Sequence, residues 1–204
     1  VNSPSEAPDF NVSLDQLTEE VPGCGAVSLV VSWFGGDLRC GTCEIRPKVE
    51  QKQFESRNMP WQVCGATRGT AQAVPELDGR PVYGGTPCDA SVIQAIRRMV
   101  AQGLDVLVYP FILMDQMDGN GLPDPWSDAE DQPELPWRGR ITLDVAPGRP
   151  GSPDGTSPAD AQVAAFFGTA QASDFTVTDG EVTYTGPEEW SYRRFILHHA
   201  ALCA

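Results

Sequence analysis

AVSLVVSWF at residues 26–34 and LDVLVYPFILM at residues 104–114 are the two stretches that decide the fold class of this chain. Both are rich in Val, Ile and Leu, and neither alternates regularly between apolar and polar residues. Continuous apolar strands of this kind are typical of parallel sheets, in which both faces of a strand are covered. Because Pro110 has no N–H to donate to a sheet, we expect the second strand to include only part of its stretch.

The segment between these two stretches predicts a helix over residues 87–102. Its apolar residues recur at helical spacing and form one stripe: Val92, Ile93, Ile96, Met99 and Val100. Gly103 follows as a C-terminal stop signal. The order strand, helix, strand is that of an α/β fold.

Three predicted helices start in the same way, with a cap residue, then Pro, then an acidic residue: Thr86-Pro87-Cys88-Asp89, Ser157-Pro158-Ala159-Asp160 and Gly186-Pro187-Glu188-Glu189. The second and third predict helices that begin at Ser157-Pro158 and at Gly186-Pro187. Short strands are predicted over residues 61–68 and 137–145. A hairpin is predicted between residues 174–179 and 181–185, across Asp179-Gly180.

The charge of the chain excludes two classes of partner. It has 28 acidic and 14 basic residues, which gives a formal net charge of −14. A surface this acidic repels nucleic acid and anionic membranes, so we expect neither as a partner. No apolar run approaches the roughly 20 residues of a membrane span. The N-terminal VNSPSEAPDF carries no signal-peptide pattern, and a helical pattern runs up to Ala204, so we expect an excerpt of a longer polypeptide.

Acidic residues follow both apolar strands and are the candidate catalytic groups. Asp115 comes directly after the second stretch, whereas Asp37 and Glu44 follow the first. In α/β barrels the active face lies at the ends of the strands, and glycoside hydrolysis uses two carboxylates. The alternative is that Asp115 caps the following loop by accepting backbone hydrogen bonds, and we favour that interpretation.

Cysteine and histidine give weaker indications of a metal site. Cys40 and Cys43 form a CxxC motif, which could be half of a zinc site or a redox pair, but no second CxxC or CxxH accompanies it. We therefore favour ordinary buried thiols or an opportunistic disulfide, and expect no cofactor. His198 and His199 are adjacent, so on a helix they point in different directions and cannot bind one metal together. His199 lies on an apolar stripe and is most simply a hydrogen-bonded core residue.

Three stretches together resemble a known family. They are VSWFGGDLRCGTCEIRPKVE (31–50), RPVYGGTPCDASVIQAIRRMVAQGLDVLVYPFILMD (80–115) and PWRGRI…PG…FFG (136–168). They are similar to the TIM-barrel-like domain of the gene transfer agent tail family, the large multidomain protein at the tail tip of phage-like particles in alphaproteobacteria. The segment YRRFILHHAALCA (192–204) resembles the helix that leads into that family's next barrel strand.

The resemblance implies an incomplete, glycoside-hydrolase-like TIM barrel of the α/β class, with long loop and hairpin insertions. Residues 1–25 would then be a linker and entry segment, and residues 26–204 the N-terminal portion of the barrel domain. The implied function is a structural component of the tail tip or baseplate, assembled in the bacterial cytoplasm. Its partners would be other tail proteins, the rest of its own polypeptide and cell-surface glycan. The alternative is an active glycoside or peptidoglycan hydrolase that aids envelope penetration.

Overall fold

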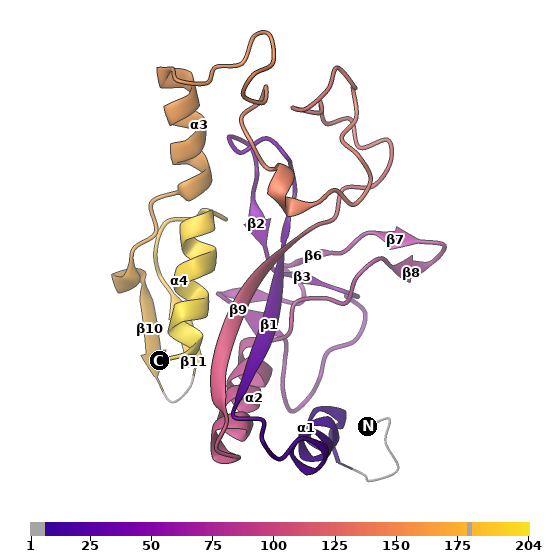
Figure 1. Cartoon of the computed structure of the whole chain (residues 1–204), viewed down its shortest axis with the longest axis vertical. Helices are drawn as coiled ribbons and strands as arrows, with labels where there is room; N and C mark the ends of the chain where they lie inside the picture. Colours follow the sequence, from indigo (N-terminus) through magenta and orange to yellow (C-terminus); the bar gives the residue numbers. More distant parts are fainter. Residues whose placement is uncertain (1–6, 179–180) are drawn as a thin grey trace.

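Two long parallel strands, β1 (Ala26–Gly35) and β9 (Asp105–Met114), run side by side through the centre of the molecule (Figure 1). The computed structural model describes residues 7–178 and 181–204. The two strands pair continuously, from Ala26 opposite Asp105 to Gly35 opposite Met114. Helix α2 (Asp89–Ala101) lies in the connection between them. The predicted strand–helix–strand unit is therefore confirmed.

The described residues form a mixed α/β structure whose remaining elements are mostly short. Its other helices are α1 (Asp9–Glu20), α3 (Ser157–Phe167) and α4 (Tyr192–Leu202). Strand β2 (Ile45–Arg46) pairs antiparallel with the end of β1. The two-stranded sheets are β3 (Lys48–Val49) with β6 (Gln72–Ala73), β4 (Gln62–Val63) with β5 (Ala66–Thr67), β7 (Glu76–Leu77) with β8 (Arg80–Pro81), and β10 (Phe175–Thr178) with β11 (Glu181–Tyr184). Within the described ranges these strands close no barrel.

One face of the β1–β9 pair is covered by helices. Val31 packs in a cluster with Val92 of α2 and Leu202 of α4. Trp33 is fully buried, and its ring lies 5.5 Å from that of Phe195 on α4. Burying side chains of this size contributes most of the stabilisation of such a core, at roughly 25 cal/mol per Å² of apolar surface.

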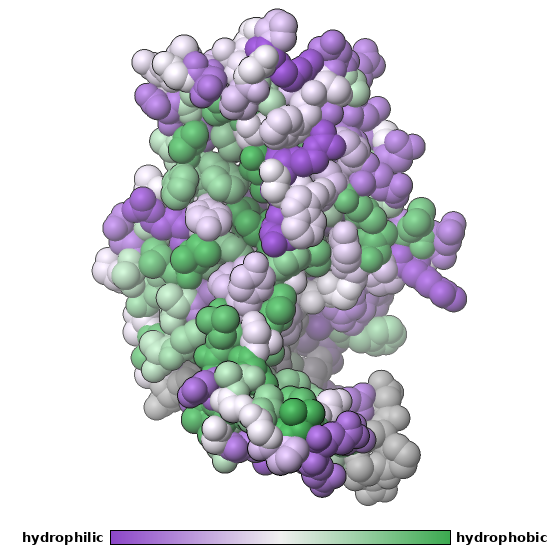
Figure 2. All heavy atoms as spheres, in the orientation of Figure 1, coloured by the Kyte–Doolittle hydropathy of each residue, from purple (hydrophilic) through white to green (hydrophobic). Residues whose placement is uncertain are grey.

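The opposite face of the pair is open, which differs from the expectation that both faces are covered. Val30 is 53% exposed and Leu107 is 63% exposed, and Tyr109 is also exposed. Figure 2 shows apolar surface over the part of the molecule where β1 and β9 lie in Figure 1. The residues of both faces are apolar, so the sequence pattern cannot distinguish a face that is covered from one that is open.

The predicted shortening of β9 at Pro110 is wrong, because the strand extends over all ten residues to Met114. Pro110 lies opposite Val31 in the middle of the pairing. Within the described residues β9 is an edge strand, since the sheet order is β2-β1-β9. An edge strand tolerates proline because the missing N–H can lie on the side without a neighbour.

The predicted helix start is confirmed for α3, α2 begins at Asp89, two residues after the predicted Pro87, and the start predicted for α4 is wrong. Helix α4 begins at Tyr192, six residues after the predicted Gly186. Its N-cap is Ser191, whose hydroxyl oxygen accepts the backbone N–H of Arg194 at 3.1 Å. A serine cap of this kind satisfies one of the free N–H groups of the first turn, and it outweighs the Pro-acid pattern upstream.

The predictions of short strands are confirmed only in part. Residues 61–68 form the β4–β5 hairpin rather than a single strand, with its turn at Cys64-Gly65. Residues 137–145 form no strand and contain a 3₁₀ turn over Arg138–Arg140 and one bridge from Thr142 to Arg39. The hairpin β10–β11 is confirmed, while Asp179 and Gly180 lie outside the described residues.

Helix α1 lies inside the segment 1–25 that the sequence predicts to be a linker and entry segment. Leu14 is buried against Met99 of α2 and Leu104. Asp15 accepts a hydrogen bond from Arg98 of α2 at 2.6 Å. The helix therefore packs on the α2 side of the molecule, near the N-terminal ends of β1 and β9 (Figure 1).

Two adjacent glycines of the YGGTP motif differ sharply in their surroundings, which gives a matched test of the packing. A Cβ on Gly85 would lie 2.8 Å from the backbone N of Glu50 and 2.9 Å from the backbone O of Lys48, whereas a Cβ on Gly84 meets nothing within 4 Å. We expect Gly85→Ala to lower the free energy of unfolding by about 1–3 kcal/mol, because backbone atoms must shift. Gly84→Ala should change it by less than about 0.5 kcal/mol. Urea unfolding of both variants makes the comparison, and equal effects would contradict the close approach.

Candidate site at the carboxyl ends of the parallel strands

The pairing of β1 with β9 brings two of the predicted carboxylates to one edge of the sheet. Gly35 and Met114 are the last paired residues, so Asp115 follows β9 directly where Gly36 and Asp37 follow β1. The carboxyl ends of parallel strands meet at the same edge, which is where ligands bind in open α/β folds. Asp37 and Asp115 are both buried.

Asp115 forms a buried ion pair with Lys48 of β3. The Lys48 Nζ donates to Asp115 Oδ2 at 2.7 Å, and the side chains are 11% and 4% exposed, respectively. Burial raises the pKa of Asp115 above its ordinary value, and the nearby ammonium of Lys48 only partly opposes this. The carboxylate therefore gains its stabilisation from one cation in a poorly solvated place.

The position of Lys48 depends on Thr86, the residue after Gly84 and Gly85. The Thr86 hydroxyl accepts the backbone N–H of Lys48 at 3.2 Å and donates to the carbonyl of Ser32 on β1 at 2.8 Å. The Thr86 N–H donates in turn to the Lys48 carbonyl at 2.8 Å. These bonds attach the start of β3 to β1 and hold the ammonium at the end of β9.

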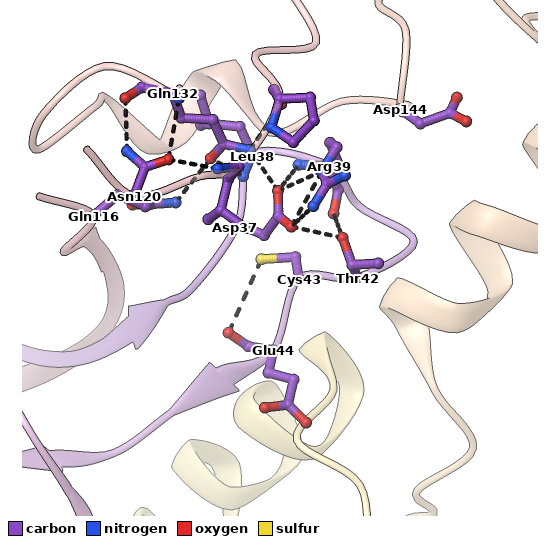
Figure 3. A network of polar contacts seen from close by, with 12 residues as sticks. Asp37, Leu38, Arg39, Thr42, Cys43, Glu44, Gln116, Asn120, Gln132 and Asp144 are labelled. Atoms are coloured by element: carbon purple, nitrogen blue, oxygen red, sulfur yellow. Dashed lines mark hydrogen bonds and ion pairs between the residues drawn. The ribbon is translucent and has the colours of Figure 1, made fainter. Parts of the chain in front are cut away.

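Asp37 is held by a different set of donors, all from loops (Figure 3). Its carboxylate accepts from Arg39 Nη2 at 2.7 Å, from the Thr42 hydroxyl at 2.7 Å and from Gln132 Nε2 at 2.6 Å. Burial alone would raise the pKa of Asp37, but the hydrogen bonds from Arg39 and the other donors outweigh it and hold the pKa below its ordinary value. Asp37 is thus an ionised carboxylate with its acceptor positions occupied.

Gln132 connects the loop after β9 to the loop after β1. Its side chain is buried, and its Oε1 accepts from the backbone N–H of Leu38 at 2.9 Å and from Gln116 Nε2 at 3.2 Å. Asn120 donates to the Gln132 carbonyl at 2.7 Å. Figure 3 shows these side chains together around Asp37. No local pattern indicates a role for this amide, because residue 132 is 95 positions away from Asp37.

Glu44 does not belong to this site. Its side chain is 53% exposed and pairs with Arg46 at 2.6 Å. In Figure 3 the carboxylate of Glu44 points away from Asp37. The reason is local: β2 pairs antiparallel with β1 through Phe34–Arg46 and Gly35–Ile45, so the chain has already turned back before Glu44.

Cys40 and Cys43 are buried free thiols that pack in different apolar clusters. Cys40 lies with Leu143 and Ala159, whereas Cys43 lies in the cluster of Trp33. Burial raises the pKa of both thiols, that of Cys43 to about 12. Across residues 7–178 and 181–204 no three Cys, His, Asp or Glu side chains are arranged to hold a metal ion. The arrangement is that of inert, protonated thiols.

Both carboxylates of the strand-end site are therefore held in ion pairs. Asp115 is bonded to Lys48, and this pair attaches the start of β3 to the end of β9. Asp37 is bonded to Arg39 of its own loop, and Gln132 joins that loop to the one after β9. A glycoside hydrolase needs one protonated acid and one available carboxylate. Neither ion pair leaves its carboxylate free, although the raised pKa of Asp115 is the property that a general acid requires.

A second polar cluster, which the sequence did not predict, lies between α2, α4 and the β4–β5 turn. Asp89 Oδ1 accepts from His198 Nε2 at 2.9 Å, and Asp89 Oδ2 accepts the backbone N–H of Cys64 at 3.1 Å. Burial alone would lower the pKa of His198, but the bond to Asp89 and the nearby Cys64 raise it to about 9. In the sequence Asp89 is an acidic residue of the first helical turn, and the contact with His198 is not indicated because the two residues are 109 positions apart.

His199 is a hydrogen-bonded core residue, as predicted. Its Nδ1 donates to the carbonyl of Phe195 at 2.7 Å, and its Nε2 has no hydrogen-bond partner in the part of the chain that is described. Burial lowers the pKa of His199 to about 4. The two adjacent histidines therefore carry different charges at neutral pH.

No protein-family model and no curated protein matches the chain. Among the described residues, no helix has both the length and the apolar character needed to cross a membrane. The assignment of a function therefore rests on the residues and the geometry described above.

Proposed function

We propose that this chain is part of a structural component of a phage-like particle, located in the tail tip or baseplate and built on a TIM-barrel-like domain. Residues 26–204 would supply the N-terminal part of the barrel, with β1 and β9 as neighbouring barrel strands. The particle would be assembled in the cytoplasm of the producing bacterium. Other tail proteins and the remainder of the same polypeptide are the proposed partners, and cell-surface glycan is a further one.

The observation that carries the structural role is the pairing of both strand-end carboxylates. Asp115 is paired with Lys48, which attaches β3 to the end of β9, and Asp37 is paired with Arg39 and accepts a hydrogen bond from Gln132 of the loop after β9. If one partner of such a buried pair moved to contact a substrate, the other would be left as an unpaired buried charge, which is costly. The site therefore favours a fixed scaffold over acid–base turnover.

The barrel architecture is supported by the open face and edge of the β1–β9 pair. Val30 and Leu107 expose apolar side chains on the face opposite the helices, and β9 is an edge strand among the described elements. Exposed apolar sheet faces and edges are aggregation hazards unless further structure covers them. In a barrel this face points inward and further strands pair with the edge of β9.

A hydrolase is the second candidate, and one observation favours it. The pKa of Asp115 is raised by burial at the carboxyl end of a parallel strand, which is where barrel hydrolases place catalytic carboxylates. In that case Asp115 would serve as the general acid, and its bond to Lys48 would have to open when a glycan binds.

Assembly of particles distinguishes the two candidates. We expect Asp115→Asn, introduced into the polypeptide of a particle-producing strain, to lower the yield of assembled tails at least several-fold, because the loops after β1 and β9 lose their attachment. Glu44→Gln is the matched control, since Glu44 is exposed and pairs only with Arg46. Particle counts by electron microscopy and co-purification of tail proteins make the measurement. Normal tails with Asp115→Asn, combined with loss of glycan cleavage, would favour the hydrolase instead.

A further inference from the structure

A cavity of about 460 Å³ lies where helices α3 and α4 meet the 3₁₀ turn of residues 138–140. Figure 1 shows both helices on the same side of the β1–β9 pair. Neither Asp37 nor Asp115 lines the cavity, so it is separate from the strand-end site. Its volume lies in the range of about 300–1,000 Å³ that is typical of small-molecule sites.

The walls of this cavity are mainly apolar. Leu143 is buried and packs in one cluster with Cys40, and both line the cavity. Phe166 of α3 stacks on Tyr192 of α4, with ring centroids 5.5 Å apart. The other apolar lining residues are Ile112, Ile141, Val163 and Phe167. Because burial of apolar surface is the main favourable term in most binding, such walls favour a ligand with an apolar body.

Arg138 is the only charged residue among the described residues that line the cavity. The Cζ of its guanidinium lies 3.9 Å from the ring centroid of Phe111 and 4.1 Å from that of Trp137. The two aromatic rings attract the cation and restrict its position, but they carry no charge that neutralises it. The cavity therefore combines apolar walls with one fixed positive group.

The charge of Arg138 has no counter-ion within residues 7–178 and 181–204. No carboxylate of these residues forms an ion pair with it, and its Nη1 is buried without a hydrogen-bond partner. Arg140 of the same turn, in contrast, pairs with Asp124 at 3.4 Å. The chain has twice as many acidic as basic residues, 28 against 14, and yet none of them reaches Arg138. An anion that enters the cavity would supply the missing charge.

We propose that this cavity binds a small carboxylic acid with an apolar body. The ligand carboxylate pairs with the guanidinium of Arg138, whose planar fork of N–H donors matches the two carboxylate oxygens. The apolar body lies against Leu143 and the stacked rings of Phe166 and Tyr192. The charge of the ligand thus complements the one uncompensated cation of the cavity, and its body complements the walls. This inference is independent of the proposed tail function.

A segment of an acidic protein is the alternative occupant, and it has less support. A peptide brings backbone N–H and C=O groups into the cavity, and each of them needs a hydrogen-bond partner when it is buried. Apart from Arg138, the lining side chains with oxygen or nitrogen atoms are those of Thr142 and Tyr192. A ligand whose only polar group is its carboxylate avoids this cost.

The first test compares octanoate with octanamide at pH 7 by isothermal titration calorimetry, because the two molecules differ mainly in charge. We expect octanoate to bind at least about tenfold more tightly, since only the carboxylate pairs with Arg138. From butanoate to octanoate, the affinity should rise by up to about fourfold for each methylene. Equal affinities of octanoate and octanamide, or no saturable binding of octanoate, would overturn the proposal. Binding of an acidic peptide without binding of octanoate would overturn it in favour of a protein partner.

Variants locate the binding in this cavity. Arg138→Gln should weaken octanoate binding by about 10- to 100-fold and leave octanamide binding unchanged. Arg140→Gln is the matched control from the same turn, because Arg140 does not line the cavity, and it should change the affinity by less than about twofold. Octanoate binding that Arg138→Gln leaves intact would contradict the assigned site.

A second pair of variants tests the cavity without changing Arg138, so a folding defect of Arg138→Gln does not decide the outcome. Val163 of α3 lines the cavity and is exposed, so polar side chains are tolerated there. Val163→Glu places a negative charge beside the ligand, whereas Val163→Gln has nearly the same size without the charge. We expect octanoate to bind Val163→Glu at least about threefold more weakly than Val163→Gln. Equal octanoate affinities of the two variants would contradict the proposal.

Discussion

Asp115→Asn should lower the free energy of unfolding by about 3–5 kcal/mol, the largest effect expected of any single substitution considered for this chain. The substitution leaves the ammonium of Lys48 buried, with only 11% of its side chain exposed, and without its carboxylate. Breaking one side of a buried pair costs more than the pair contributes, because the remaining charge stays unsolvated. Urea unfolding followed by tryptophan fluorescence measures the loss.

Two controls separate the buried charge from other causes. Glu44→Gln removes a carboxylate of an exposed pair and should cost less than about 1 kcal/mol. Replacing both partners, with Lys48→Met and Asp115→Leu together, should recover most of the loss, since paired apolar side chains often replace a buried ion pair without cost. A double variant as unstable as Asp115→Asn would show that the carboxylate has another role.

The stability of the chain should depend on pH in opposite directions on the two sides of pH 6.5 because of His198 and His199. The pKa of His198 is raised to about 9 in the folded chain, so its contribution is complete below pH 6.5 and is lost as the pH rises through 9. The pKa of His199 is lowered to about 4, so the folded chain binds fewer protons than the unfolded chain between pH 4 and 6.5. The contribution of His199 to the free energy of unfolding is therefore complete above pH 6.5 and is lost as the pH falls towards 4. Each contributes about 3 kcal/mol.

The alkaline side gives the cleaner measurement, because carboxylates titrate on the acid side. Wild-type chain should lose about 3 kcal/mol of unfolding free energy between pH 6.5 and 9.5. His198→Gln should flatten this dependence, since glutamine still donates to Asp89 but does not titrate. His199→Phe should leave the alkaline slope unchanged. The same slope in wild type and His198→Gln would mean that His198 is neutral in the folded chain.

The elements that the sequence predicted correctly are those specified by local patterns. The continuous apolar runs produced β1 and β9, and the stripe ending at Gly103 produced α2. The predicted positions of Asp37 and Asp115 followed from the strands, since parallel strands end at one edge. The wrong start predicted for α4 is also local in origin, because both Gly186-Pro187 and Ser191 can begin a helix, and the helix begins after Ser191.

The parts that the sequence could not predict depend on contacts between distant residues. Gln132 reaches Asp37 across 95 positions, Lys48 reaches Asp115 across 67, and His198 reaches Asp89 across 109. Lys48 and Cys64 lie in segments without a periodic pattern or a metal-binding spacing. Single residues of common types carry no such signal until the fold brings them together.

The most direct test of the structural role is release of reducing ends from purified cell-wall glycan by particles that carry this chain. The account predicts no release above that of a blank without particles, because both carboxylates are bound in ion pairs. Release by wild-type particles that disappears with Asp115→Asn and persists with Glu44→Gln would contradict it, and would identify the strand-end site as catalytic.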